Sequence, residues 1–266
     1  MAGRLKYFVA VIVVFLITEI LLYLCGQYIN PKVLIYMYHS VSDEPLSLEE
    51  SELSVIPAEF EKQLAYFSKR EIPTLFADEL PDRSSDEARC VVLTFDDGYE
   101  DNYTEVFPLL KKYNCKATIF MIASLIDTPG YLSSEQIREM TDSGLVSIQS
   151  HTVYHLPMAL GGWSYEAIDY ELGESKRIIE DISGRPVTAL AMPNGSYDPK
   201  VIEVAEKYYN VAFTGTDFRV YSPDELMDIH RVGIYRRHRL SDVRRLTDNR
   251  GVYFAKRFLQ KLVGAA

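Results

Sequence analysis

Residues 91–99 read Val-Val-Leu-Thr-Phe-Asp-Asp-Gly-Tyr, an apolar, β-branched run that ends in two carboxylates and a glycine. This pattern predicts a buried strand followed by a turn, and Asp-Asp-Gly alone could be no more than that turn. In β/α barrels, however, the carboxyl ends of the strands carry the chemistry. Successive residues of a strand point to opposite sides, so we expect Asp96 and Asp97 to differ in role, one as a cation ligand and one as a base.

Five more short apolar runs resemble this strand, at residues 33–38, 117–121, 145–149, 188–192 and 211–213. Segments with helical spacing of apolar residues lie between the runs, at 57–70, 105–113, from 133 onward, 165–182 and 199–209. Alternation of strands and helices with short connections indicates parallel βα units. We therefore predict an α/β fold, a distorted (β/α) barrel of about seven parallel strands.

The first thirty residues differ from the rest of the chain. Tyr7 to Cys25 is apolar except for Glu19, and the basic residues Arg4 and Lys6 precede it. This length suits one transmembrane helix, and the flanking charges would leave the rest of the chain outside the cytoplasm. We expect a membrane anchor, with a cleaved signal peptide and secretion, or a buried helix, as alternatives.

We expect three regions: the anchor or signal at 1–30, a catalytic domain at 31–240 and a basic helical tail at 241–266. The tail could pack on the barrel or lie on a membrane surface. The net charge of −10 makes a nucleic-acid partner unexpected. Cys90 and Cys115 each precede a strand, and they could be two separate thiols or a disulfide.

A second motif, Ser-His-Thr-Val-Tyr-His at 150–155, also follows an apolar run. Two histidines spaced i and i+4 lie on one side of a helical turn, and imidazole is a common metal ligand. With a strand-end aspartate, His151 and His155 would form a three-ligand set that leaves one position open for water, as catalytic zinc sites do.

These residues match a family. The sequence resembles the polysaccharide deacetylases, which are metal-dependent carbohydrate esterases. The family motifs stand at Thr94–Gly98 (TFDDG), His151–Leu156 (HTVYHL) and Ala191–Tyr197 (AMPNGSY). The resemblance covers about Val33 to Tyr235, and Met37–Val41 looks like the branch of poly-N-acetylglucosamine deacetylases.

The resemblance implies that Asp97, His151 and His155 bind a divalent metal, zinc first, with cobalt or nickel possible. It implies that Asp96 is the general base and that the backbone N–H of Asn194 helps to hold the oxyanion.

Three further roles are less constrained. The general acid would be His39 at the end of the first strand, with His230 as the alternative. Most family members brace the base with an arginine at the position of Ala191, and Arg231 is the candidate replacement here. Aromatic residues beside the motifs, Tyr99, Trp163 and Tyr197, are candidates for sugar contact.

We expect a monomeric, metal-dependent hydrolase that removes N-acetyl groups from an extracytoplasmic polysaccharide. The alternatives are a catalytically silent barrel that binds glycan, and a metal-dependent hydrolase of another amide or ester, since fold does not fix substrate.

Overall fold

The computed structural model describes residues 32–44, 50–83, 88–158, 162–195, 197–216 and 221–248. The chain divides into two compact units, of which the larger comprises Lys32–Leu240 and the other joins Met1–Pro31 to Ser241–Ala266. In the second unit only residues 241–248 are described, and they are helical. All the candidate site residues belong to the larger unit.

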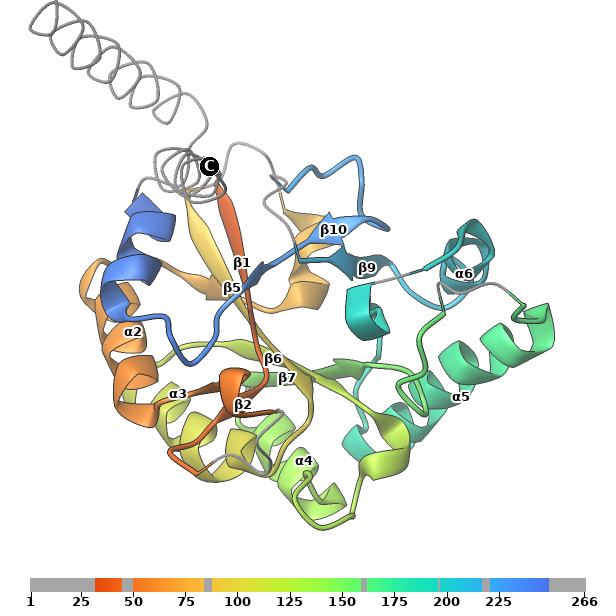
Figure 1. Cartoon of the computed structure of the whole chain (residues 1–266), viewed down its shortest axis with the longest axis horizontal. Helices are drawn as coiled ribbons and strands as arrows, with labels where there is room; N and C mark the ends of the chain where they lie inside the picture. The colour runs from red at the N-terminus through yellow and green to blue at the C-terminus, as the bar shows by residue number, and fades with distance from the viewer. Residues whose placement is uncertain are drawn as a thin grey trace, which may run out of the picture. The chain divides into compact units, whose positions relative to one another are not determined.

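An all-parallel sheet forms the frame of this unit and curls into a nearly closed barrel (Figure 1). Its strands follow the order β10-β9-β8-β7-β6-β5-β1-β11, and β4 pairs with β5 outside this path. The bounds are β1 (Val33–Tyr38), β4 (Thr74–Leu75), β5 (Cys90–Asp97), β6 (Ala117–Met121), β7 (Val146–Ser150), β8 (Ala189–Ala191), β9 (Val211–Gly215), β10 (Ile229–His230) and β11 (Val232–Gly233).

The predicted barrel class is confirmed, and each of the six apolar runs is a strand. In the part of the chain that the structure describes, the sheet has nine strands rather than about seven, because β4, β10 and β11 have two residues each, too short to show as apolar runs. A separate small sheet pairs β2 (Ser40–Val41) with β3 (Ser54–Val55).

The two ends of the barrel sheet are consecutive in the chain. Ile229 of β10 pairs with Phe213 of β9, and Val232 of β11 pairs with Tyr36 of β1. Arg231 is the single residue between these two strands. The segment 229–233 therefore spans the seam of the barrel, and it places Arg231 at the point of near-closure.

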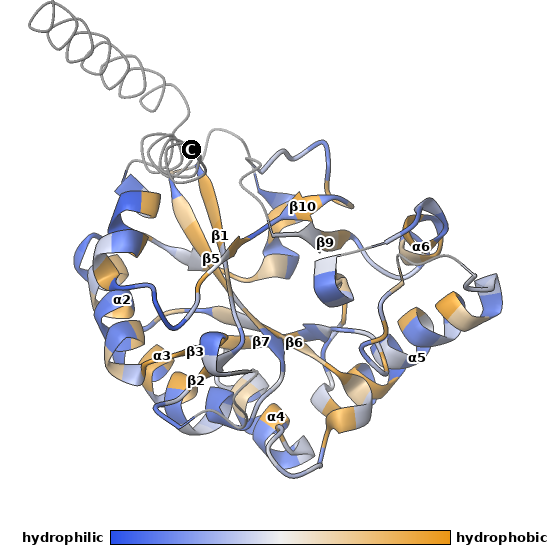
Figure 2. Ribbon diagram, viewed as in Figure 1, coloured by the Kyte–Doolittle hydropathy of each residue, from blue (hydrophilic) through white to orange (hydrophobic). Residues whose placement is uncertain are grey.

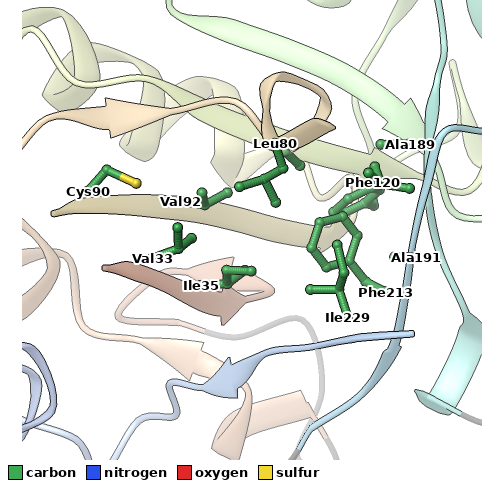
Figure 3. Close-up of a cluster of buried hydrophobic side chains, with 12 residues drawn as sticks. Val33, Ile35, Leu80, Cys90, Val92, Phe120, Ala189, Ala191, Phe213 and Ile229 are labelled. Carbon is green, nitrogen blue, oxygen red and sulfur yellow. The ribbon is translucent and has the colours of Figure 1, made fainter. Parts of the chain in front are cut away.

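Alternate residues of the strands fill the interior of the barrel (Figure 3). Towards the amino ends of the strands this interior is apolar. Strand residues and two residues of the 3-10 helix Ala77–Asp82 form one buried cluster, which comprises Val33, Ile35, Ala77, Leu80, Cys90, Val92, Phe120, Ala189, Ala191, Val211, Phe213 and Ile229. On β5 the same alternation continues from Val92 through Thr94 to Asp96. The interior thus changes from apolar to charged towards the carboxyl ends of the strands, where chemistry is placed in such folds.

Helices surround the sheet and turn their apolar faces inward (Figures 1 and 2). Their bounds are α2 (Pro57–Lys69), α3 (Phe107–Tyr113), α4 (Ser134–Asp142), α5 (Tyr165–Ser183) and α6 (Pro199–Ala205). The predicted start of α4 is confirmed, since Ser133 and Gln136 form a capping box. The helix expected at 105–113 is α3 with a π-helical turn, Asn102–Val106, before it.

Several expectations fall outside the described residues, namely the apolar segment 7–25 and the tail beyond residue 248. Within the described ranges, no helix combines the length and the apolar character needed to cross a bilayer. Cys90 and Cys115 are both buried, and no disulfide joins them. The structure therefore favours two separate thiols over a disulfide.

Candidate active site

The carboxyl end of β5 turns sharply at the two aspartates. Asp97 has a φ of 72°, and the N–H of Gly98 donates to the carbonyl of Asp96 at 2.9 Å, which closes a three-residue turn. Gly98 itself has a φ of 81°, and a Cβ atom there would overlap the sulfur of Met121. A left-handed backbone at a non-glycine residue costs about 1 kcal/mol or more and often marks a functional site. The turn separates the two carboxylates.

Asp97 faces the two motif histidines. One ligand atom from each of Asp97, His151 and His155 lies within 4.8 Å of the others. The Asp97 Oδ1 atom is 3.6 Å from Nε2 of His151 and 3.7 Å from Nε2 of His155. Three donors at these separations can converge on a single cation about 2 Å from each of them.

His151 is oriented by the main chain. Its Nδ1 atom lies 2.7 Å from the carbonyl oxygen of Ala191, so Nδ1 carries the proton and Nε2 presents a lone pair. Burial disfavours the charged imidazolium and lowers the pKa of His151 to about 4, and burial also lowers the pKa of His155. Both rings are neutral near pH 7, the form that binds metals. The donor set therefore fits a divalent cation such as zinc.

The two histidines are not on a helical turn, contrary to the prediction from their spacing. Residues 151–155 form an irregular loop after β7, in which Thr152 and His155 have φ values of 67° and 55°. These left-handed residues fold the loop back and bring the two imidazole centroids to 4.8 Å. Spacing alone could not reveal this, because an i, i+4 pair is the usual sign of a helix.

Arg231 pairs with Asp96 inside the barrel. Its Nη1 and Nη2 atoms lie 2.6 and 2.7 Å from the two carboxylate oxygens, and Nη1 also donates to the Thr94 hydroxyl at 3.1 Å. The guanidinium lies over the rings of Phe120 and Phe213. Burial opposes the charged carboxylate, but the Arg231 guanidinium, together with the nearby His151 and His39, outweighs it and lowers the pKa of Asp96 to about 2. Asp96 is therefore ionised at neutral pH.

The two candidate acids lie in different surroundings. His39 follows β1 and lies within electrostatic reach of Asp96. Its Nδ1 atom is buried without a hydrogen-bond partner among the described residues. The His230 ring packs on Gly215, and its Nε2 atom is 3.4 Å from Asp228. Since Arg231 points into the barrel, the alternation turns His230 the other way.

Sequence reasoning missed the residue that fixes the segment after His39. The Asp101 carboxylate accepts hydrogen bonds from the Ser40 hydroxyl and the Val41 N–H, and the neighbouring Asn102 amide donates to the His39 carbonyl. Asp101 is close to the first motif, but only the fold shows that it reaches back to β2.

The remaining candidates surround the site at different depths. Asn194 is exposed, with a φ of 57°, in the turn after β8. Trp163 is half-buried ahead of α5, and the Tyr197 hydroxyl donates to Asp228. Tyr99 is only 4% exposed and stacks on Tyr131, so little of its ring is accessible to a sugar. Tyr154, between the two histidines, is 53% exposed and offers more surface.

Two neutral imidazoles and a carboxylate beside a buried, ionised aspartate define a hydrolytic centre at the mouth of a β/α barrel. The sequence profile named Polysaccharide deacetylase matches residues 83–212. The Bacillus subtilis protein YxkH, whose name assigns it to the polysaccharide deacetylases, is 34% identical over 208 residues, which cover 76% of this chain and 71% of that protein. The chain therefore belongs to the polysaccharide deacetylase family, and it is a hydrolase of amide carbon–nitrogen bonds.

Other relatives agree with this assignment. The crystal structure of BC0361, a polysaccharide deacetylase from Bacillus cereus, is 31% identical with a TM-score of 0.70, covering 83% of this chain and 68% of that one. A protein of Staphylococcus epidermidis named poly-β-1,6-N-acetyl-D-glucosamine N-deacetylase is 32% identical over 114 residues, which are 40% of this chain and 39% of that protein.

Replacing His151 should abolish metal binding. We expect His151→Ala to lose zinc on gel filtration, because one of three converging donors is removed. Zinc content per chain, measured by atomic emission, checks this. His238→Ala is the control, since His238 is also buried but bonds the backbone of Tyr235. Equal zinc content in His151→Ala and the unmodified chain would contradict the ligand assignment.

The Asp96–Arg231 pair should govern the pH dependence of stability in the metal-free protein. The lowered pKa of Asp96 stabilises the fold above pH ~4, and this contribution is lost as the pH falls towards 2. In Arg231→Met, burial alone would raise that pKa, so the contribution would instead fall as the pH rises. We expect a loss of about 3–5 kcal/mol in the free energy of unfolding at pH 7, and less at pH 4.

Urea unfolding at both pH values measures this difference. Arg177→Met is the control, because Arg177 is exposed and pairs with Glu174 and Asp181 on the surface, where ion pairs add little. A loss in Arg231→Met that is the same at pH 4 and pH 7 would show that the carboxylate is not what the arginine stabilises.

Proposed function

We propose that this chain removes N-acetyl groups from an N-acetylated polysaccharide outside the cytoplasm, using a divalent cation held by Asp97, His151 and His155. The observation that carries the proposal is the convergence of these three donors beside a carboxylate that Arg231 keeps ionised. All the parts of a hydrolytic site are present, which favours an enzyme over a silent glycan-binding barrel.

A bound cation would polarise the acetamide carbonyl and lower the pKa of water. Asp96 is ionised at neutral pH, and a water made more acidic by the cation would give up its proton to this carboxylate more readily. Arg231 fixes both carboxylate oxygens, so Asp96 is held in one orientation for that transfer. Asp96 takes the water proton while the new carbon–oxygen bond forms.

The negative charge that develops on the carbonyl oxygen needs a donor, and the Asn194 N–H is our candidate. The carbon–nitrogen bond then breaks, and the leaving amine takes a proton as acetate is released. His39 is our first candidate for this acid, because it follows β1 at the strand end near Asp96, whereas the Nε2 atom of His230 lies 3.4 Å from Asp228.

The relatives and the exposed aromatic rings support a proposal for the substrate class. One relative is named for poly-β-1,6-N-acetyl-D-glucosamine, so we propose a polymer that contains N-acetylglucosamine. We call residues 151–155 the histidine loop. It carries one large exposed aromatic side chain, Tyr154, and α5 carries two more, Tyr165 and Tyr170. Aromatic faces suit contact with sugar rings. With Trp163 and Tyr197, these three tyrosines are candidates for contact with the chain of sugars.

The location also remains a proposal. The apolar segment 7–25 supports a membrane anchor with the catalytic unit on the outer side. A monomer needs no further element, since the candidate ligands, base and acid all come from one chain.

Acetate release from N-acetylglucosamine oligomers tests the activity. We expect release by the zinc-loaded protein, none after chelation, and recovery with zinc, cobalt or nickel. Asp96→Asn should keep its zinc and lose turnover by at least about 100-fold, because the base is gone. Asp78→Asn is the control, because Asp78 bonds Ser147 away from the metal ligands. Zinc binding without acetate release would favour the silent barrel, and release from other esters or amides alone would favour a different substrate.

The identity of the acid can be separated from general damage to the site. We expect His39→Ala to slow hydrolysis of the sugar acetamide by about 100-fold or more, and 4-nitrophenyl acetate much less, because nitrophenolate leaves without a proton. His230→Ala should slow neither substrate strongly. The reverse ranking of the two variants on the acetamide would transfer the role to His230.

A further inference from the structure

A buried carboxylate that none of the motifs contains contacts the histidine loop from behind. Glu171 lies on α5 and is 3% exposed. Its Oε2 atom accepts hydrogen bonds from the backbone N–H of Val153 at 2.9 Å and of Tyr154 at 3.0 Å. These two residues are the ones that separate the ligands His151 and His155.

We propose that Glu171 is a positioning residue for the metal site, which sets the separation of His151 and His155 by holding the backbone between them. The proposal rests on the function proposed above, since it assigns these histidines to a cation.

The carbonyls of Thr152 and Val153 accept hydrogen bonds from the N–H groups of Ala123 and Ser124, at 3.0 Å each. The N–H groups at 152–155, by contrast, all donate to side chains. The N–H of Thr152 donates to the Ser150 hydroxyl, and that of His155 donates to the Thr152 hydroxyl. Both acceptors belong to the same short segment, so they do not tie it to another element. Of these four N–H groups, those of Val153 and Tyr154 donate to a residue distant in sequence, Glu171.

The loop also needs such a tie because its backbone is unusual. Thr152 and His155 are both left-handed without being glycine, on either side of the two anchored residues. Such conformations persist only where the surroundings enforce them. Two N–H donors that converge on one anionic oxygen make a stronger restraint than neutral hydrogen bonds would.

A merely structural role is the competing explanation. On the next position of α5, Leu172 is fully buried, and Ser175 contacts Ser150 through its hydroxyl at 2.7 Å. The helix would therefore pack on β7 without Glu171. If Glu171 only supported this packing, its loss should lower the melting temperature as Leu172→Ala does and leave metal affinity unchanged.

The test compares zinc affinity in the 266-residue chain, measured by competition with a chromogenic chelator. We expect Glu171→Ala to weaken zinc binding by about 10- to 100-fold, the usual effect of losing a partner behind the ligands. Glu171→Gln should weaken it less, because its amide oxygen can still accept both bonds. Leu172→Ala should lower the melting temperature and bind zinc as the unmodified chain does.

Amide hydrogen exchange in the metal-free protein gives a second readout. Exchange at Val153 and Tyr154 should accelerate in Glu171→Gln, and further in Glu171→Ala, while exchange in the core strands changes less. If Glu171→Ala does not fold, the zinc affinity and the amide exchange of Glu171→Gln test the proposal instead.

Zinc affinity in Glu171→Ala equal to that of the unmodified chain would overturn the proposal, as would an equal loss in Leu172→Ala. If the unmodified chain binds no zinc, the proposed function fails. In that case only the exchange rates test whether Glu171 positions the loop. Unchanged protection of the Val153 and Tyr154 amides in the Glu171 variants would reject that role.

Discussion

The ion pair between Asp96 and Arg231 is the interaction on which the rest of this site depends. It joins the end of β5 to the seam of the barrel. The same contact supports the near-closure of the sheet, balances the charge of Asp96 and fixes the orientation of its carboxylate. Both side chains are almost fully buried, and removal of either would leave a charge without a partner in the interior. The pair keeps the predicted base ionised and fixed, while the neighbouring Asp97 is left to face the histidines.

Strain is concentrated where the candidate ligands lie. Asp97, Thr152 and His155 all have a left-handed backbone. Asp97 is the last residue of β5, and the other two lie in the loop that follows β7. The regular barrel holds the strand ends, and hydrogen bonds from the backbone of Ala123 and Ser124 and to the side chain of Glu171 hold the loop. A rigid frame with a few strained residues at its mouth places three donors within reach of one cation.

The third motif lacks the arginine that the resemblance to the family leads one to expect. At that position the chain has Ala191, whose side chain cannot reach Asp96 with a charge and whose carbonyl oxygen contacts His151. The bracing cation comes from Arg231, forty residues later, across the near-closure of the sheet. The site therefore keeps a buried positive charge although the usual position lacks it.

The sequence by itself determined the barrel class, its six main strands and the residues that could form the site. It did so because apolar runs that end in Asp or His are local signals of strands and of chemistry at their ends. The helical turn expected at His151–His155 was wrong, because left-handed residues and the carboxylate of Glu171 shape that loop instead.

Only the tertiary structure decided which distant residues meet. The pairing of Arg231 with Asp96 depends on β10 and β11, two-residue strands that carry no sequence pattern and form only when the sheet curls round to meet itself. In the sequence, Glu171 is likewise only one of several acidic residues on α5. Its role comes from packing, since hydrogen bonds between segments far apart in the chain are made by the fold and leave no mark on local periodicity.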